Sequence, residues 1–319
     1  MKIVVLDAYT LNPGDNPWTE VEALGKAEIY DRTPQERIVE RSRDADVLIV
    51  NKVGLPRAVI DQLPKLKYIA VTATGFDVID IVAAGERGIP VSNVPVYGTN
   101  SVAQFVFATL LHFCHRVALH DAEVHAGEWT RCPDFCFWRT PLTELAGQRM
   151  GIVGFGRIGR RIGELAHAFG MEVLASDVNT TSAPNYSQFS WASLQEIAEC
   201  SDVISLHCPL TDESLGIVNR SFLSRVKPNC ILINASRGPL VVDRDLAEAL
   251  NAGRLAGAAV DVVSVEPIRE DNPLLSAKNC LITPHMAWAT LAARKRLMAT
   301  TVSNIKSYQK GVPQNVVNP

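Results

Sequence analysis

The segment that most constrains the fold is a short apolar stretch that runs into a glycine-rich turn and then opens a helix. Residues 149–160 read RMGIVGFGRIGR, which contains the pattern Gly154-x-Gly156-x-x-Gly159. Gly154 permits a tight turn from strand to helix, Gly156 lets a phosphate approach bare backbone, and Gly159 lets the helix pack close to the strand. The first turn of the helix then faces the anion. This order of elements predicts a site for the pyrophosphate of a dinucleotide.

A carboxylate follows at the end of the next predicted strand. Residues 171–177 read MEVLASD, and we expect Asp177 to lie where the ribose of the dinucleotide binds. Its charge can accept hydrogen bonds from both ribose hydroxyls of NAD but repels the 2′-phosphate of NADP, and no Arg or Lys occurs at 178–181. The pattern therefore favours NAD. The alternative is an ordinary aspartate at a strand end that caps a turn.

Composition and charge exclude several functional classes. The chain has 319 residues, 47% hydrophobic and 20% charged, which is typical of a soluble globular protein with room for two domains. Its net charge is −3 and it has no basic block, so we expect no nucleic-acid partner. The first residues, MKIVVLD, predict a strand rather than a signal peptide, and no apolar run is long enough to span a membrane. We therefore expect a cytoplasmic protein without a membrane partner.

The cysteines indicate reduced thiols rather than a disulfide framework. There are seven, an odd number, and they are scattered along the chain. Cys132 and Cys136 have no second pair at ligand spacing, so the sequence predicts no metal site.

Two series of alternating strands and helices run along the chain. The first has predicted strands at 3–6, 46–51, 68–72 and 91–94 and helices at 34–43, 56–63 and 80–87. The second begins at Arg149 and has further strands at 171–177, 203–206, 230–235, 256–262 and 281–283. Such alternation implies parallel sheets. The sequence predicts an α/β protein with two doubly wound domains of the Rossmann or flavodoxin-like type.

Two further helices set the expected domain boundaries. Residues 100–127 are apolar around much of a helical circumference, which predicts one long helix buried between domains or subunits. A last helix at 288–308 has no strand after it, so we expect it to complete the first domain. The predicted domains are 1–99 with 288–319, and 100–287. Their two connections would form a hinge, with a cleft at the carboxyl ends of the strands where ligands bind.

Three polar residues lie at the ends of predicted strands in the second series: Arg237, Glu266 and His285. A guanidinium binds a carboxylate bidentately, an imidazole passes a proton near neutral pH, and a carboxylate beside an imidazole fixes its tautomer and favours its charged form. Each residue alone has a plain alternative, namely a structural ion pair, a helix cap and a loop histidine. Together, in a dinucleotide-binding domain, they indicate reduction of a 2-oxo acid.

The whole chain resembles the D-2-hydroxyacid dehydrogenase family. Besides the glycine turn, the motifs that carry the resemblance are ATG at 73–75, NSVAQ at 100–104, HCPLT at 207–211, NASRG at 234–238, DVVSVEP at 261–267 and TPH at 283–285. The chain departs from the family pattern at Gln104, where many relatives carry Glu, and at Phe76, where Asn is common. We expect the first change to alter helix packing and the second to alter the substrate pocket.

The resemblance implies a role for each matching residue. Arg237 would bind and polarise the 2-oxo acid, His285 would be the general acid/base, and Glu266 would be its partner. Backbone amides of Thr74 and Gly75, in the first domain, would hold the substrate carboxylate. The implied cofactor-binding residues are Gly154, Gly156, Arg157, Ile158, Gly159, Asp177, His207, Cys208, Pro209, Thr211, Ala235, Ser236 and, on the nicotinamide side, Asp261.

Within the family, residues 134–138 (DFCFW) and 141–145 (PLTEL) are most similar to the glycerate dehydrogenase branch, also called hydroxypyruvate reductase. The resemblance implies reduction of hydroxypyruvate or glyoxylate to D-glycerate or glycolate with NADH. It also implies a homodimer whose contact includes the helix at 100–127 and the loop at 135–138. The alternatives are a relative that reduces another 2-oxo acid and a non-catalytic NAD(H)-sensing protein similar to the corepressors built on this fold.

Overall fold

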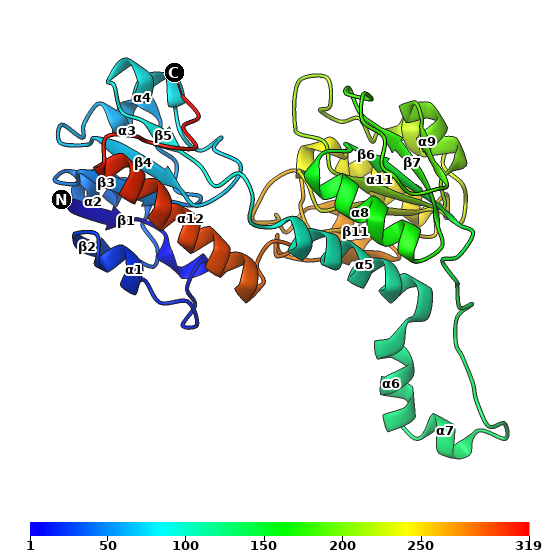
Figure 1. Ribbon diagram of the computed structural model, residues 1–319. Helices are drawn as coiled ribbons and strands as arrows, with labels where there is room; N and C mark the ends of the chain where they lie inside the picture. Colours follow the sequence, from blue (N-terminus) through cyan, green and yellow to red (C-terminus); the bar gives the residue numbers. More distant parts are fainter. Residues whose placement is uncertain (319) are drawn as a thin grey trace. The chain divides into compact units, whose positions relative to one another are not determined.

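A computed structural model describes residues 1–318. The chain divides into two compact units: unit 1 comprises Met1–Gly98 and the chain from Trp288 onward, and unit 2 comprises Thr99–Ala287. Each unit is built on one parallel sheet with helices packed against it (Figure 1). The prediction of two parallel α/β sheets is confirmed.

Unit 1 has a five-stranded sheet in the order β2-β1-β3-β4-β5. Its strands are β1 (Lys2–Val5), β2 (Lys26–Ile29), β3 (Val47–Val50), β4 (Tyr68–Val71) and β5 (Val91–Ser92), and its helices are α1 (Thr19–Glu22), α2 (Ile38–Ser42), α3 (Arg57–Ile60), α4 (Ile81–Glu86) and α12 (Leu291–Gln309). Every residue of β3 and β4 is buried, which explains their continuous apolar sequences. The last helix, α12, packs on this sheet, where Tyr308 stacks on Tyr68 with ring centroids 4.4 Å apart.

Unit 2 has a seven-stranded sheet in the order β12-β11-β10-β9-β6-β7-β8. Its strands are β6 (Arg149–Val153), β7 (Glu172–Ser176), β8 (Phe189–Trp191), β9 (Val203–Leu206), β10 (Ile231–Asn234), β11 (Gly257–Val260) and β12 (Cys280–Ile282). Its helices are α5 (Thr99–His115), α6 (Val117–His125), α7 (Glu128–Arg131), α8 (Arg157–Ala168), α9 (Leu194–Cys200), α10 (Arg220–Leu223) and α11 (Asp243–Asn251). The strand order reverses between β6 and β9. In such sheets ligands bind outside the carboxyl ends of the strands at this point.

The predicted single helix at 100–127 is wrong, because the chain breaks at Arg116. Arg116 has φ 46° and ψ 41°, in the left-handed region, and α5 and α6 meet at 53°. Most of the apolar side chains of α5 are buried in unit 2, whereas α6 has no buried residue. Among the described residues no single helix meets the length and hydropathy of a membrane span, and α5 and α6 do so only as a bent pair.

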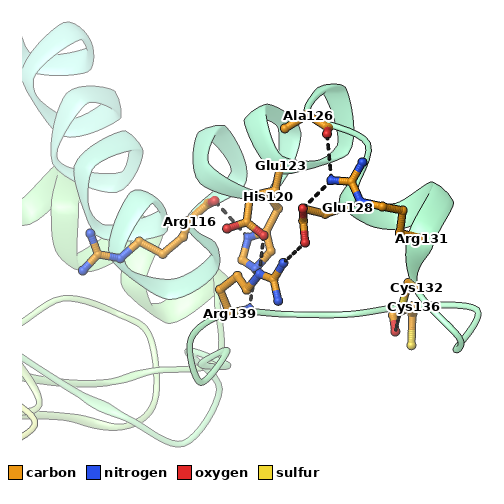
Figure 2. A network of polar contacts seen from close by, with 9 residues as sticks. All are labelled: Arg116, His120, Glu123, Ala126, Glu128, Arg131, Cys132, Cys136 and Arg139. Atoms are coloured by element: carbon orange, nitrogen blue, oxygen red, sulfur yellow. Dashed lines mark hydrogen bonds and ion pairs between the residues drawn. The ribbon is translucent and has the colours of Figure 1, made fainter.

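Residues 117–140, which we call the arm, extend away from the sheet of unit 2 (Figure 1). Polar contacts hold the arm together, as Figure 2 shows. The guanidinium of Arg139 binds Glu123 and, at 2.8 Å, Glu128, and Glu128 also binds Arg131 at 2.6 Å. The backbone N–H of Arg139 donates to Nε2 of His120 at 3.1 Å. These contacts join the returning chain to α6 and α7, so the arm has a defined shape of its own.

Candidate active site

The glycine turn between β6 and α8 leaves space for an anion. Gly154 has φ +90°, and a Cβ there would lie 2.3 Å from the backbone nitrogen of Cys208. A Cβ on Gly159 would lie 2.1 Å from the carbonyl oxygen of Gly154, so close backbone packing requires both glycines. A Cβ on Gly156, in contrast, would have no atom of the described residues within 4 Å.

The amino end of α8 is open at this turn. The helix has 12 residues, and no side chain caps it at Gly156. The first amides of a helix have no partner within the helix, and together with the helix dipole they attract anions. The open space at Gly156 and the uncapped helix therefore fit the pyrophosphate of a dinucleotide.

Asp177 follows β7 and lies directly beside the glycine turn. Its Oδ2 accepts a hydrogen bond from the backbone N–H of Phe155 at 2.5 Å, and its Oδ1 accepts one from Asn179 at 2.9 Å. The carboxylate is thus fixed in orientation at the expected ribose position. A cation that the sequence did not reveal is close to the same turn: the guanidinium of Arg160, on α8, lies 5.1 Å from the ring centroid of Phe155 and donates to Ser182 O at 2.7 Å. The sequence signal for Arg160 is its position, because it directly follows the glycine pattern in the first turn of α8.

The loops after β9 and β10 are joined to each other. The hydroxyl of Ser236 donates to the carbonyl oxygen of Cys208 at 2.8 Å. Nε2 of His207 bonds the hydroxyl of Ser205 at 2.7 Å, its Nδ1 is buried, and burial lowers the pKa of His207 to about 3. His207 therefore stays neutral, and its backbone N–H donates to the carbonyl oxygen of Val153 at 2.6 Å. Pro209, Thr211 and Ala235 lie in the same two loops.

Arg237 lies in the turn that follows β10, and two neighbours explain its position. Asn234 is fully buried and donates from Nδ2 to the carbonyl oxygen of Arg237 at 2.9 Å. A Cβ on Gly238 would lie 1.8 Å from the carbonyl oxygen of Val263, so this turn packs against the backbone of the loop that carries Glu266. Asn234 and Gly238, the first and last residues of the motif NASRG, thus fix the position of Arg237. The sequence alone indicated no separate role for Asn234.

The side chains of Glu266 and His285 are in direct contact. Nδ1 of His285 lies 2.6 Å from Oε2 of Glu266, with 27% and 35% of the two side chains exposed. β10, β11 and β12 are neighbours in the sheet, with Asn234 opposite Val260 and Val260 opposite Ile282. The loops that carry Arg237, Glu266 and His285 therefore leave three adjacent strands at the same edge of unit 2.

Asp261 directly follows β11 and is 3% exposed. Its carboxylate accepts hydrogen bonds from Thr283, Met286 and Ala287, which surround His285 in sequence. Burial raises the pKa of Asp261, and these hydrogen bonds act in the opposite direction. The side chain of Asp261 thus faces residues 283–287, which we call the His285 turn. The resemblance had implied a contact on the nicotinamide side of the cofactor and had not implied this contact.

Thr74 and Gly75 lie in unit 1, in the loop that follows β4. The hydroxyl of Thr74 donates to Val94 O at 2.9 Å, and Nδ2 of Asn93 donates to Thr74 O at 2.7 Å. These bonds give the loop a fixed backbone. Within residues 1–318 no group of three or more His, Cys, Asp or Glu side chains is placed to hold a metal ion.

The chain belongs to the D-2-hydroxyacid dehydrogenase family. Residues 107–287 match the family described as "D-isomer specific 2-hydroxyacid dehydrogenase, NAD binding domain". This range lies in unit 2, which supplies the NAD(P)-binding part of the protein.

Several known proteins are similar to this chain over all or most of its length. A hydroxypyruvate reductase of Blautia hydrogenotrophica is 50% identical over 100% of both chains, and a glycerate dehydrogenase of Methylorubrum extorquens is 39% identical over 89% of both. The solved structure of an NADPH-dependent glyoxylate/hydroxypyruvate reductase of Sinorhizobium meliloti, with NADP and malonate, has a TM-score of 0.82 at 29% identity and covers 99% of this chain and 96% of that one. These relatives fit the predicted glycerate dehydrogenase branch.

Proposed function

We propose that this protein reduces hydroxypyruvate to D-glycerate, and glyoxylate to glycolate, with a nicotinamide dinucleotide. The observation that carries the proposal is the His285–Glu266 pair, 2.6 Å apart, on strand-end loops next to the loop of Arg237. The activities of the hydroxypyruvate reductase and the glycerate dehydrogenase relatives support the choice of substrate.

His285 supplies the proton in this reaction. Its Nδ1 is engaged by Glu266, which leaves Nε2 as the ring nitrogen that can give a proton to the substrate oxygen. Because Nδ1–H donates to a carboxylate, the tautomer is fixed and the imidazolium is favoured electrostatically. In the oxidative direction the neutral imidazole takes the proton back.

Arg237 binds the substrate and stabilises the charge that develops on its oxygen. A guanidinium offers paired N–H donors that match a carboxylate and an adjacent carbonyl, and its charge does not change with pH in the working range. The bound dinucleotide supplies the hydride that reaches the carbonyl carbon. Arg237 acts on that carbon indirectly, by drawing electron density toward the oxygen as the new C–H bond forms.

We further propose that NADH is preferred to NADPH. The support is the carboxylate of Asp177, which is oriented by Phe155 and Asn179 at the end of β7 and would repel a 2′-phosphate. Arg160 is the residue that could weaken this preference, because its guanidinium lies over Phe155. The Sinorhizobium relative is described as NADPH-dependent, so the preference within the family has to be measured for each chain.

We also propose that two copies of the chain associate through the arm and the neighbouring α5. Apolar side chains on the arm are uncovered: Phe135 is 89% exposed and Trp138 61%. Exposed apolar side chains that gather on one segment mark a protein contact site, and a second copy would bury them. In sedimentation velocity at micromolar concentration we expect a dimer, with dissociation of F135S/W138S. A monomeric wild-type protein would refute this proposal, and L215S, which changes another exposed apolar side chain of unit 2, is the control.

A panel of substrates tests the proposed activity. Turnover of hydroxypyruvate, glyoxylate, pyruvate and phenylpyruvate would be followed with NADH and with NADPH. We expect the highest kcat/KM for hydroxypyruvate with NADH. A preference for pyruvate or phenylpyruvate would assign another substrate, and binding of NADH without turnover of any 2-oxo acid would indicate a sensing protein.

A further inference from the structure

We infer that Asp261 is a positioning residue whose buried carboxylate holds the turn that presents His285. The inference rests on the proposed role of His285 as proton donor. It gives Asp261 a task different from a contact with the nicotinamide, and it makes the rate of reduction depend on a residue that acts through His285.

Four hydrogen bonds from the His285 turn end on Asp261. Oδ1 accepts from the hydroxyl of Thr283 at 2.7 Å and from the N–H of Met286 at 2.8 Å, and Oδ2 accepts from the N–H of Ala287 at 2.8 Å. The backbone oxygen of Asp261 accepts from the N–H of His285 itself at 2.8 Å. Donors before, at and after His285 thus converge on one residue.

The conformation of His285 needs this support. Its φ is 53°, in the left-handed region that residues with a Cβ adopt only at a cost. Such a conformation persists where the surrounding bonds determine it fully. The bonds to Met286 and Ala287 fix the two peptides that follow His285, and they thereby direct its ring toward Glu266.

Hydrogen bonds from the turn use three of the roughly four lone pairs of the carboxylate. Oδ1 already accepts two hydrogen bonds, and Oδ2 accepts one. Asp261 is 3% exposed and Ala287 4%, and the hydroxyl of Ser101, on α5, holds the far side of the turn by donating to Ala287 O at 2.7 Å. The turn is therefore fixed from two sides by groups that do not touch the imidazole.

Three roles for Asp261 predict different results. A purely structural role predicts lower stability with normal activity of the folded protein. A contact with the nicotinamide predicts weaker NADH binding. A positioning role predicts a loss of kcat/KM that disappears when His285 is absent, since the effect passes through that side chain.

A double-mutant cycle separates these roles. D261N keeps the shape of the side chain but replaces one acceptor oxygen with an NH2 donor that faces other donors. We expect it to lower kcat/KM for hydroxypyruvate reduction by about 10²-fold, the scale for misplacing a reacting group by about 1 Å. In the H285A background the same change should cost less than about threefold, and NADH affinity, from fluorescence titration, should stay within about threefold in every variant.

Amide hydrogen exchange at Met286 and Ala287 gives a readout that does not require activity. We expect slow exchange in the wild-type protein and fast exchange in D261N. T283V removes one donor and keeps the carboxylate, so it should fold and lower kcat/KM less than D261N. The control is D202N, which changes a carboxylate that accepts from Arg149 N–H at the amino end of the same sheet, and neither exchange at the turn nor kcat/KM should change.

Three results would overturn the inference: additive losses in D261N/H285A, an NADH affinity that falls with kcat/KM, or unchanged exchange at Met286 and Ala287. If D261N does not fold, T283V takes its place. Unchanged amide exchange at Met286 and Ala287 together with an unchanged kcat/KM in T283V would overturn the inference. A wild-type protein that turns over no 2-oxo acid would refute the proposed function. The exchange experiment would still test the role of Asp261. Fast amide exchange in D261N would support the conclusion that Asp261 holds the turn, and slow exchange would refute that conclusion.

Discussion

Replacing Glu266 with Gln tests the electrostatic part of the proton-donor assignment. The amide keeps an oxygen that can accept from Nδ1 of His285, so the ring stays oriented, while the negative charge is lost. Reduction needs the imidazolium, so the reductive kcat/KM is high at low pH and falls as pH rises. Without Glu266 the imidazolium is less stable, and the midpoint of this fall moves toward acid.

The size of the shift follows from the geometry of the pair. Its atoms are 2.6 Å apart, but 27% and 35% of the side chains are exposed, so solvent screens the attraction. For an ion pair with this exposure we take about 1 kcal/mol, the upper end of the range for exposed pairs. An energy of this size corresponds to about a fivefold loss of reductive kcat/KM on the alkaline side of the profile.

The assay is kcat/KM against pH in both directions, with hydroxypyruvate and NADH for reduction and D-glycerate and NAD for oxidation. The oxidative limb should rise where the reductive limb falls, and E266Q should move both toward acid by the same amount. E270Q, which neutralises an exposed acid four residues farther along the chain, serves as the control and should leave both limbs in place. Profiles of E266Q that coincide with the wild type, or that move toward alkali, would refute the pairing argument.

The remaining predictions concern the substrate arginine and the dinucleotide site. R237K should lower kcat/KM nearly as much as R237A, because Lys keeps the charge but loses the planar pair of donors, and near-native kinetics of R237K would remove Arg237 from the site. D177S should weaken NADH and improve NADPH in paired titrations, and a wild-type protein that already prefers NADPH would contradict this role. G156A should keep its stability and lose NADH affinity, whereas G154A should lose about 1–3 kcal/mol of unfolding free energy in denaturant titrations, since its Cβ would meet backbone. Equal stabilities of the two glycine variants would contradict the close backbone contact at Gly154.

Much of the candidate site was predictable because it depends on local sequence and on strand order. Parallel strands bring their carboxyl ends to one edge of a sheet, so Arg237 and His285, each just beyond a predicted strand, had to emerge near each other once β10, β11 and β12 were neighbours. The glycine turn was readable for the same reason: its spacing reflects the backbone contacts of Gly154 and Gly159.

Other features depend on contacts that a linear pattern does not contain. The break at Arg116 is a single left-handed residue, and the apolar residues of α6 continue the pattern of α5 although they are exposed. The strands β2 and β8 were not predicted, because they are short edge strands without a fully buried residue. The orientation of Asp261 toward residues more than 20 positions away required the register of β11 and β12.

The most direct test of the proposed chemistry compares the wild-type protein with H285A in hydroxypyruvate reduction, with NADH affinity measured in parallel. We expect turnover by the wild type and a loss in H285A of about 10²–10⁴-fold in kcat/KM, the usual contribution of a positioned proton donor, with NADH affinity unchanged. An H285A protein that keeps the wild-type rate and its dependence on pH would contradict the assignment of His285 as proton donor, because the proton would then come from another group.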